Sequence, residues 1–141
     1  MSNGWERIRL RVETVETFKA ETMSQNTNDT RTISCHVLDT ALGKAVHDLP
    51  LTVYRQTNNG EWQELGHHST NTDGRVGQLL DGKDFQSGIY KLKFNVQSYF
   101  ERCKVPSFYP FIEIVVKCEQ GQHYHVPLLL SPFGYTTYRG T

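Results

Sequence analysis

From residue 32 to the end of the chain, apolar and polar residues alternate in short stretches that are separated by turn residues. A period of two places successive side chains on opposite faces of a strand and is typical of strands with one buried face. Asn58-Asn59-Gly60 and Asp73-Gly74, which lie between such stretches, are strong signals for tight turns. The pattern predicts strands at 32–38, 49–56, 60–67, 72–80, 87–96, 111–118, 123–130 and 134–140.

Short strands at this regular spacing favour an all-β fold, a two-sheet antiparallel sandwich. Only residues 95–103, NVQSYFERC, have a helical composition, so we expect one short helix there. No internal repeat or second domain is visible, and a chain of 141 residues can bury the core of a single domain. We therefore expect one domain that spans residues 32–141.

The first 31 residues differ from this domain because they are mostly polar and charged. Residues 24–30, SQNTNDT, offer too little apolar surface to pack, and we expect residues 1–31 to form a flexible N-terminal arm. Within the arm, residues 7–15, RIRLRVETV, alternate in a way that suits an edge strand, a targeting leader or a solvated segment. The histidine or glutamine expected near the end of a peroxisomal leader is missing. Met23 could serve as an alternative start.

Charge and cysteine content restrict the class of partner and the compartment. Lys+Arg and Asp+Glu both number 15, so the net charge is zero and no basic field attracts nucleic acid or anionic lipid. Cys35, Cys103 and Cys118 are widely spaced, which argues against a disulfide framework or a zinc knuckle and favours reduced core thiols. No stretch is apolar and long enough for a membrane span or a signal peptide. We expect an intracellular protein, either cytoplasmic or peroxisomal.

Histidines provide the first candidate chemistry. His123 and His125 are two residues apart on one predicted strand and therefore face the same side. With His36 as a third ligand they could bind a catalytic zinc, although no carboxylate or cysteine lies nearby at ligand spacing. They could equally be surface or hydrogen-bonded histidines.

His36 and Arg75 form a second candidate pair. Ile33, Cys35 and Val37 are the expected core positions of their strand, so His36 should point to the opposite face. Arg75 follows the Asp-Gly turn at the start of a strand, where its planar guanidinium could engage a carbonyl or an oxyanion. A solvated arginine is the simpler alternative. The pattern alone thus indicates a β-sandwich with a possible His/Arg site.

Three segments resemble the transthyretin-related family, and in particular its 5-hydroxyisourate hydrolase branch: CHVLDTALGKA, TDGRVG and HYHVPLLLSPFGYTTYRGT. The likeness runs from about Ile33 to the last residue. That branch has a histidine in a His-Val-Leu-Asp motif, an arginine after the Asp-Gly turn, a histidine in a His-Val-Pro motif and a terminal Tyr-Arg-Gly-Ser. Here His36, Arg75 and His125 match the first three, while Thr141 replaces the terminal serine.

The family's hormone carriers have lysine, glutamate and threonine at these three positions, and their chains continue past the tetrapeptide. The resemblance therefore implies the enzyme, which opens a cyclic amide of 5-hydroxyisourate in urate catabolism. It implies that the two histidines activate water, that the arginine stabilises the developing charge and that no metal or organic cofactor is needed. It also implies that four residues bind substrate, namely Tyr138, Arg139, Gly140 and Thr141.

The same resemblance implies a homotetramer, in which two dimers meet around a channel that holds the sites. The apolar run VPLLLSPF is consistent with this, because a half-exposed strand should alternate. Pro127 suggests an edge or bulged strand, since proline cannot donate to a ladder. If the final strand runs into the channel, its end forms a wall of the site. A non-catalytic carrier of a thyroid-hormone-like ligand and a zinc hydrolase remain as alternatives.

Overall fold

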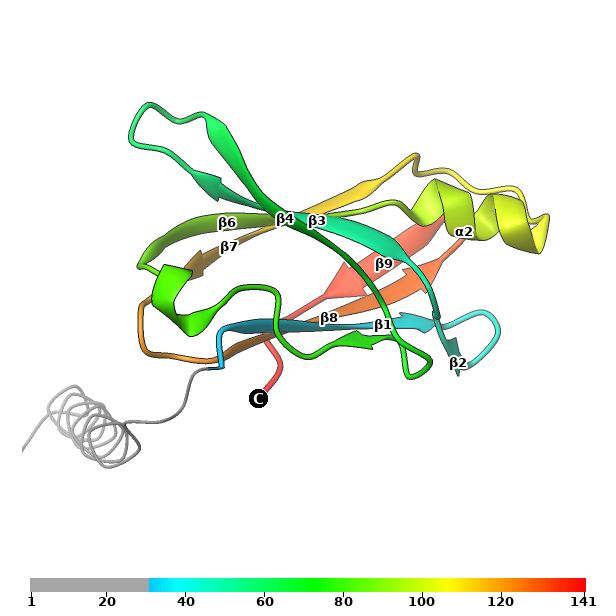
Figure 1. Ribbon diagram of the computed structural model, residues 1–141. Helices are drawn as coiled ribbons and strands as arrows, with labels where there is room; N and C mark the ends of the chain where they lie inside the picture. Colours follow the sequence, from blue (N-terminus) through cyan, green and yellow to red (C-terminus); the bar gives the residue numbers. More distant parts are fainter. Residues whose placement is uncertain (1–30) are drawn as a thin grey trace, which may run out of the picture.

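The computed structural model describes residues 31–141, which form a sandwich of two sheets (Figure 1). Sheet A contains five strands: β1 (Ile33–Asp39), β2 (Lys44–Ala45), β5 (Arg75–Val76), β8 (Tyr124–Ser131) and β9 (Gly134–Thr137). Sheet B contains four strands: β3 (Pro50–Gln56), β4 (Trp62–Ser69), β6 (Gly88–Phe94) and β7 (Ile112–Cys118). The expected arm at 1–31 lies, apart from Arg31, outside the described residues, and the boundary at residue 32 stays a prediction.

Alternation along the central strands of sheet A separates the core from the outer face. The side chains that point inward are almost completely buried: Ile33, Cys35 and Val37 of β1, and Val126, Leu128 and Leu130 of β8. The intervening positions of both strands point away from sheet B, and they include His36 and His125. Two adjacent strands therefore present their polar positions on one surface, opposite to the core.

The prediction of a two-sheet sandwich is confirmed, and one pair of strands runs parallel within it. β1 pairs with β8 in parallel, whereas all other pairs among the described strands are antiparallel. A parallel pair needs a long crossover, which the whole of sheet B provides here. The pairing places Ser34 beside His125 and His36 beside Pro127.

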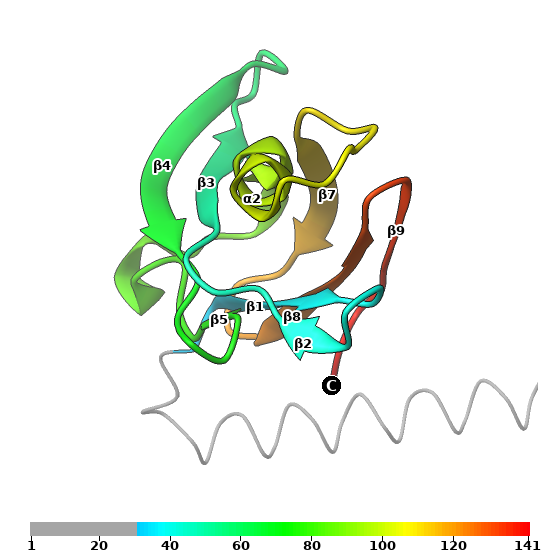
Figure 2. The same cartoon turned by 90° about the vertical axis from the view of Figure 1, so that its right-hand side faces the viewer.

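Helix α2 (Val96–Cys103) confirms the short helix expected at 95–103. The Asn95 side chain caps it by accepting the backbone N–H of Ser98. The helix joins β6 to β7 at one end of the sandwich, and Figure 2 views it along its axis. Tyr99 lies on the buried side of the helix, and its hydroxyl donates to Asp39 Oδ2 over 2.7 Å. The end of β1 is thus tied to α2.

Some local features of the structure differ from the predictions. The stretch 72–80 contains only the two-residue strand β5, because most of its other residues form turns and bends. The pattern anticipates neither β2 nor the 3-10 helix at Gly82–Asp84. Pro127 lies in β8, which pairs on both sides, so the edge-strand prediction is wrong. Its missing N–H is tolerated where the ladder to β9 stops at Leu128.

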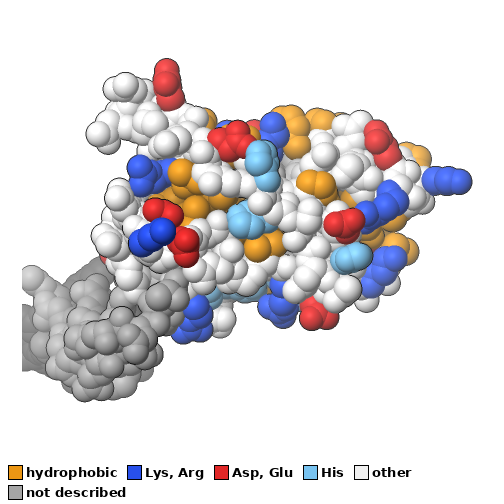
Figure 3. Space-filling model, viewed as in Figure 1, with side chains coloured by type: hydrophobic (Ala, Val, Ile, Leu, Met, Phe, Trp, Pro, Cys, Tyr) orange, Lys and Arg blue, Asp and Glu red, His pale blue; other side chains and the backbone are white. Residues whose placement is uncertain are grey.

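The surface agrees with a zero net charge. Acidic and basic side chains are interspersed over the face shown in Figure 3. Cys35 and Cys118 are buried, as expected, and Cys103 is half-buried. Within residues 31–141 there is no helix of the length and apolarity that a membrane crossing requires.

Candidate active site

His36 and His125 lie on neighbouring strands of sheet A and face outward from the core. Their ring centroids are 6.4 Å apart. Arg75 of β5 pairs directly with His36 across the other edge of β1. Directly paired residues share a face of the sheet, so the three predicted catalytic side chains come together on the outer face of sheet A.

The turn before β5 fixes the backbone of Arg75. Asn71 Oδ1 accepts the backbone N–H groups of Asp73 and Arg75, each over 2.9 Å. Gly74 has φ +76°, and a Cβ built there would lie 2.5 Å from the carbonyl oxygen of Val37. Glycine is therefore required both by the conformation and by the close approach to β1.

Hydrogen bonding and burial define the protonation of the two imidazoles. His36 Nε2 lies 3.0 Å from the carbonyl oxygen of Asp73, which can only accept, so Nε2 carries a hydrogen and Nδ1 holds the lone pair of the neutral ring. Burial lowers the pKa of His36, and the positive charge of Arg75 lowers it further. The pKa of His125 is lowered by burial first, then by Arg75 and His36. Both rings are thus kept neutral near pH 7, so each has a lone pair that can accept a proton.

An open cleft of about 410 Å³ lies beside these residues, within the usual range of about 300–1,000 Å³ for small-ligand sites. It is lined by Arg31, Ser34, Cys35, Arg75, Val76, Gly77, His123, His125 and Thr141. His36 is not part of the lining but lies next to it, through its contact with His125. The cleft contains the polar groups that a small polar ligand would need.

The last residues of the chain pass from β9 to the outer face of sheet A, as both views show (Figures 1 and 2). The backbone N–H of Gly140 donates to the carbonyl oxygen of His125 over 2.8 Å. A Cβ on Gly140 would lie 2.6 Å from Cδ2 of the His125 ring. Thr141 then reaches the cleft with Arg75 and His125. The terminal segment therefore packs directly against a candidate catalytic histidine.

Tyr138 and Arg139 are placed differently from Thr141. The Arg139 guanidinium stacks 4.5 Å from the ring centroid of Tyr124, on β8. Both Tyr138 and Arg139 line a second, more apolar cavity of about 340 Å³, which shares His125 with the first. Of the four residues expected to bind substrate, only Thr141 lines the first cleft. Gly140 does not line it but packs against His125, which does.

The described residues also bear on the metal alternative. Residues 31–141 contain no group of three or more His, Cys, Asp or Glu side chains arranged to hold a metal ion. His123 Nδ1 instead contacts the carbonyl oxygen of Thr32 over 3.0 Å. His67 and His68 lie on β4, an edge strand of sheet B, and so do not belong to the candidate site on sheet A.

The family is decided by comparison with known proteins. The model of the HIUase/Transthyretin family matches residues 33–140. This chain belongs to that family. One relative is a 5-hydroxyisourate hydrolase of Mus musculus, which is 42% identical over 77% of this chain and 94% of its own. Another is 5-hydroxyisourate hydrolase 2 of Rhizobium meliloti, which is 44% identical over 77% of this chain and 95% of its own. The predicted membership of the hydrolase branch is confirmed by these relatives.

Solved structures of both branches share the fold. Sea bream transthyretin in complex with thyroxine superposes with a TM-score of 0.74 at 28% identity, over 77% of this chain and 94% of its own. Klebsiella pneumoniae 5-hydroxyisourate hydrolase superposes with a TM-score of 0.69 at 27% identity, over 78% of this chain and 99% of its own. The fold is therefore common to a thyroxine-bound transthyretin and a hydrolase, so the fold alone does not distinguish between them.

Sequence reasoning missed three residues that shape the site: Ser34, Asn71 and Gly140 as a contact of His125. Alternation alone places Ser34 on the face of His36. Its position beside His125 depends on the parallel pairing of β1 with β8, which no local pattern announces. Asn71 could have been identified, because asparagine often accepts backbone N–H groups at the start of a turn.

Proposed function

We propose that this chain hydrolyses 5-hydroxyisourate, opening a cyclic amide of that compound in urate catabolism. The observation that supports this most strongly is the convergence of His36, His125 and Arg75 on one face of sheet A, beside a cleft of suitable size. The relatives at about 40% identity that are named 5-hydroxyisourate hydrolase support the same substrate.

Water needs a base in this reaction, because it is a weak nucleophile near neutral pH. A neutral imidazole of the His36–His125 pair takes a proton from water as the oxygen attacks the ring carbonyl. The resulting imidazolium then returns the proton to the ring nitrogen as the carbon–nitrogen bond breaks. The products carry one added water, and the histidines end as they began. The lowered pKa values of both rings support this role.

Arg75 stabilises the negative charge that develops on the attacked carbonyl oxygen. Its rigid backbone turn and its pairing with His36 hold it beside the reacting groups. Thr141 contributes a hydroxyl to the same cleft. Gly140 lets the terminal segment approach His125, while Arg139 and Tyr138 anchor that segment on its other side. We propose that the reaction uses no metal and no organic cofactor.

We also propose that the chain forms a homotetramer, a dimer of dimers. β9 is an edge strand of sheet A, with exposed Phe133 and Tyr135 next to exposed Phe108. An open strand edge flanked by aromatic side chains is a surface that a second copy can cover. Sedimentation equilibrium tests this: we expect the mass of four chains, and a monomer would contradict it.

The function is tested by following the decay of 5-hydroxyisourate after its generation by urate oxidase. Adding this protein should accelerate the decay, and the rate should be the same with and without EDTA. Loss of activity with EDTA would support a zinc hydrolase. Unchanged decay, together with binding of an aromatic ligand, would support the carrier, an alternative that the likeness to thyroxine-bound transthyretin keeps open.

A further inference from the structure

A serine that has no part in the chemistry above connects His125 of β8 with His123, which lies just before that strand. Ser34 is 8% exposed and lies beside His125 in the parallel pairing of β1 and β8. Its Oγ is 2.7 Å from His125 Nδ1 and 3.4 Å from His123 Nε2. His123 Nδ1 in turn contacts the carbonyl oxygen of Thr32 over 3.0 Å. The four groups form one continuous chain of contacts.

The carbonyl oxygen of Thr32, at one end of this series of contacts, sets the direction of the hydrogen bonds. A carbonyl oxygen only accepts, so His123 Nδ1 must carry a hydrogen. A neutral imidazole has one N–H, and the Nε2 of His123 therefore holds a lone pair and accepts from the Ser34 hydroxyl. Ser34 has a single hydroxyl hydrogen, so its oxygen accepts from Nδ1–H of His125. His125 Nε2 is then left with the lone pair.

The reverse direction is disfavoured while His123 is neutral. If Ser34 donated to His125, its oxygen would face the lone pair of His123 Nε2, and two acceptors would oppose each other. The 3.4 Å distance is long for a hydrogen bond. Among the hydrogen bonds of residues 31–141, however, Ser34 Oγ is the only polar partner of His123 Nε2.

We infer that Thr32, His123 and Ser34 form a relay that holds His125 in its Nδ1–H tautomer and leaves Nε2 as the basic atom. This inference rests on the proposed function, because the base matters only if His125 activates water. Ser34 and His123 are positioning residues, which act on the reaction through the ring of His125. A histidine whose tautomer is fixed presents its lone pair to the reaction in every turnover.

The ring nitrogens of His125 report the tautomer directly in nitrogen-15 NMR of the full chain without substrate. We expect Nδ1 protonated and Nε2 unprotonated at neutral pH in the wild type. Ser34→Ala removes the hydroxyl and should convert His125 to a mixture of tautomers, whereas Ser34→Thr, which keeps a hydroxyl, should retain the wild-type tautomer. In the hydrolysis assay Ser34→Ala should lower kcat about tenfold with little change in KM, by analogy with metal-binding histidines, for which loss of the orienting partner typically costs about 10–100-fold.

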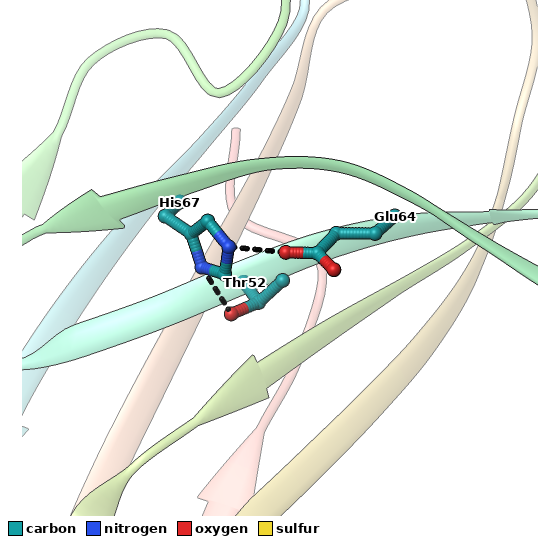
Figure 4. Close-up of polar contacts among 3 residues, drawn as sticks. All are labelled: Thr52, Glu64 and His67. Carbon is teal, nitrogen blue, oxygen red and sulfur yellow. Dashed lines mark hydrogen bonds and ion pairs between the residues drawn. The ribbon is translucent and has the colours of Figure 1, made fainter.

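A matched control exists on the outer face of the other sheet. There the Thr52 hydroxyl contacts His67 Nδ1 over 3.0 Å, and His67 Nε2 pairs with Glu64 (Figure 4). The three side chains come from β3 and β4. Thr52→Ala removes the same kind of hydroxyl–imidazole contact, and it should leave both the His125 tautomer and the turnover unchanged.

Two results would overturn the relay: an Nε2–H tautomer of His125 in the wild type, or an unchanged tautomer in Ser34→Ala. The wild-type measurement stands even if a variant fails to fold. It also needs no substrate, so failure of the relay can be told from failure of the proposed function, which would appear as absence of turnover with the tautomer as expected.

Discussion

Arg75 lowers the pKa of both His36 and His125, although burial of the two rings has the larger effect. The neutral imidazole is the base in the proposed reaction, so activity is lost as falling pH protonates it. Because both pKa values are lowered, the acid limb of kcat/KM should lie below the ordinary histidine pKa of about 6.5.

Replacing the arginine tests this assignment. Arg75→Gln removes the positive charge, raises the pKa of both histidines and should move the acid limb to higher pH. Arg75→Lys keeps the charge and should leave the limb near its wild-type position, although kcat falls because the planar fork is lost. The pH dependence of kcat/KM measures both. A limb that stays in place in the glutamine variant would show that Arg75 does not act on the histidines.

Gly140 is the second residue whose identity matters, since any Cβ there would press on the ring of His125. Gly140→Ala should displace either the ring or the terminal segment and lower kcat/KM about tenfold or more, because small misplacements of catalytic groups are costly. Gly134→Ala in β9 is the control, as its Cβ would meet Ser131 Oγ at an ordinary 3.7 Å. Equal activity of the two variants in the hydrolysis assay would mean that the close approach has no functional consequence.

At the scale of elements, one buried hydrogen bond fastens α2 to the end of β1. The Tyr99 hydroxyl donates to Asp39, and both residues are less than 5% exposed. Asp39 also accepts the backbone N–H groups of Ala41 and Leu42 after the strand. Burial, followed by the neighbouring carboxylate, raises the pKa of Tyr99, so the hydroxyl stays a donor at all ordinary pH values.

Tyr99→Phe should lower the free energy of unfolding by about 1.5–3 kcal/mol, the usual worth of a hydrogen bond to a charged group. Urea denaturation measures this, with an unchanged slope expected because the fold is retained. Tyr54→Phe on the outer face of sheet B should stay within about 0.5 kcal/mol of the wild type. An unchanged free energy of unfolding in Tyr99→Phe would show that this hydrogen bond does not hold the helix to the strand.

Local signals accounted for some elements and missed others. The turn at Gly60 and the cap at Asn95 depend on residues close in sequence, so the hairpin of β3 and β4 and the helix α2 could be predicted. The parallel pairing of β1 with β8 joins residues about 90 positions apart, and no period or turn residue encodes it. The pairing of β5 with β1 likewise joins segments that are distant in sequence, so no local pattern marks where β5 lies.

Over the whole molecule, the candidate site exists only because distant segments meet on one face of sheet A. His36, Arg75 and His125 come from three strands, and Thr141 comes from the end of the chain. The family resemblance alone identifies all four of these residues. It does not separate Tyr138 and Arg139, which line a different cavity, from Thr141, because the course of the chain after β9 depends on contacts with the distant strand β8, such as the hydrogen bond from Gly140 to His125.

The central claim is that this histidine pair performs the hydrolysis, and its most direct measurement is the turnover of 5-hydroxyisourate by single histidine variants. His36→Ala and His125→Ala should each lower kcat by at least about a hundredfold, as loss of an acid–base group typically does. His67→Ala, which changes an exposed histidine on sheet B, should retain wild-type turnover. Wild-type turnover in either His36→Ala or His125→Ala would contradict the account.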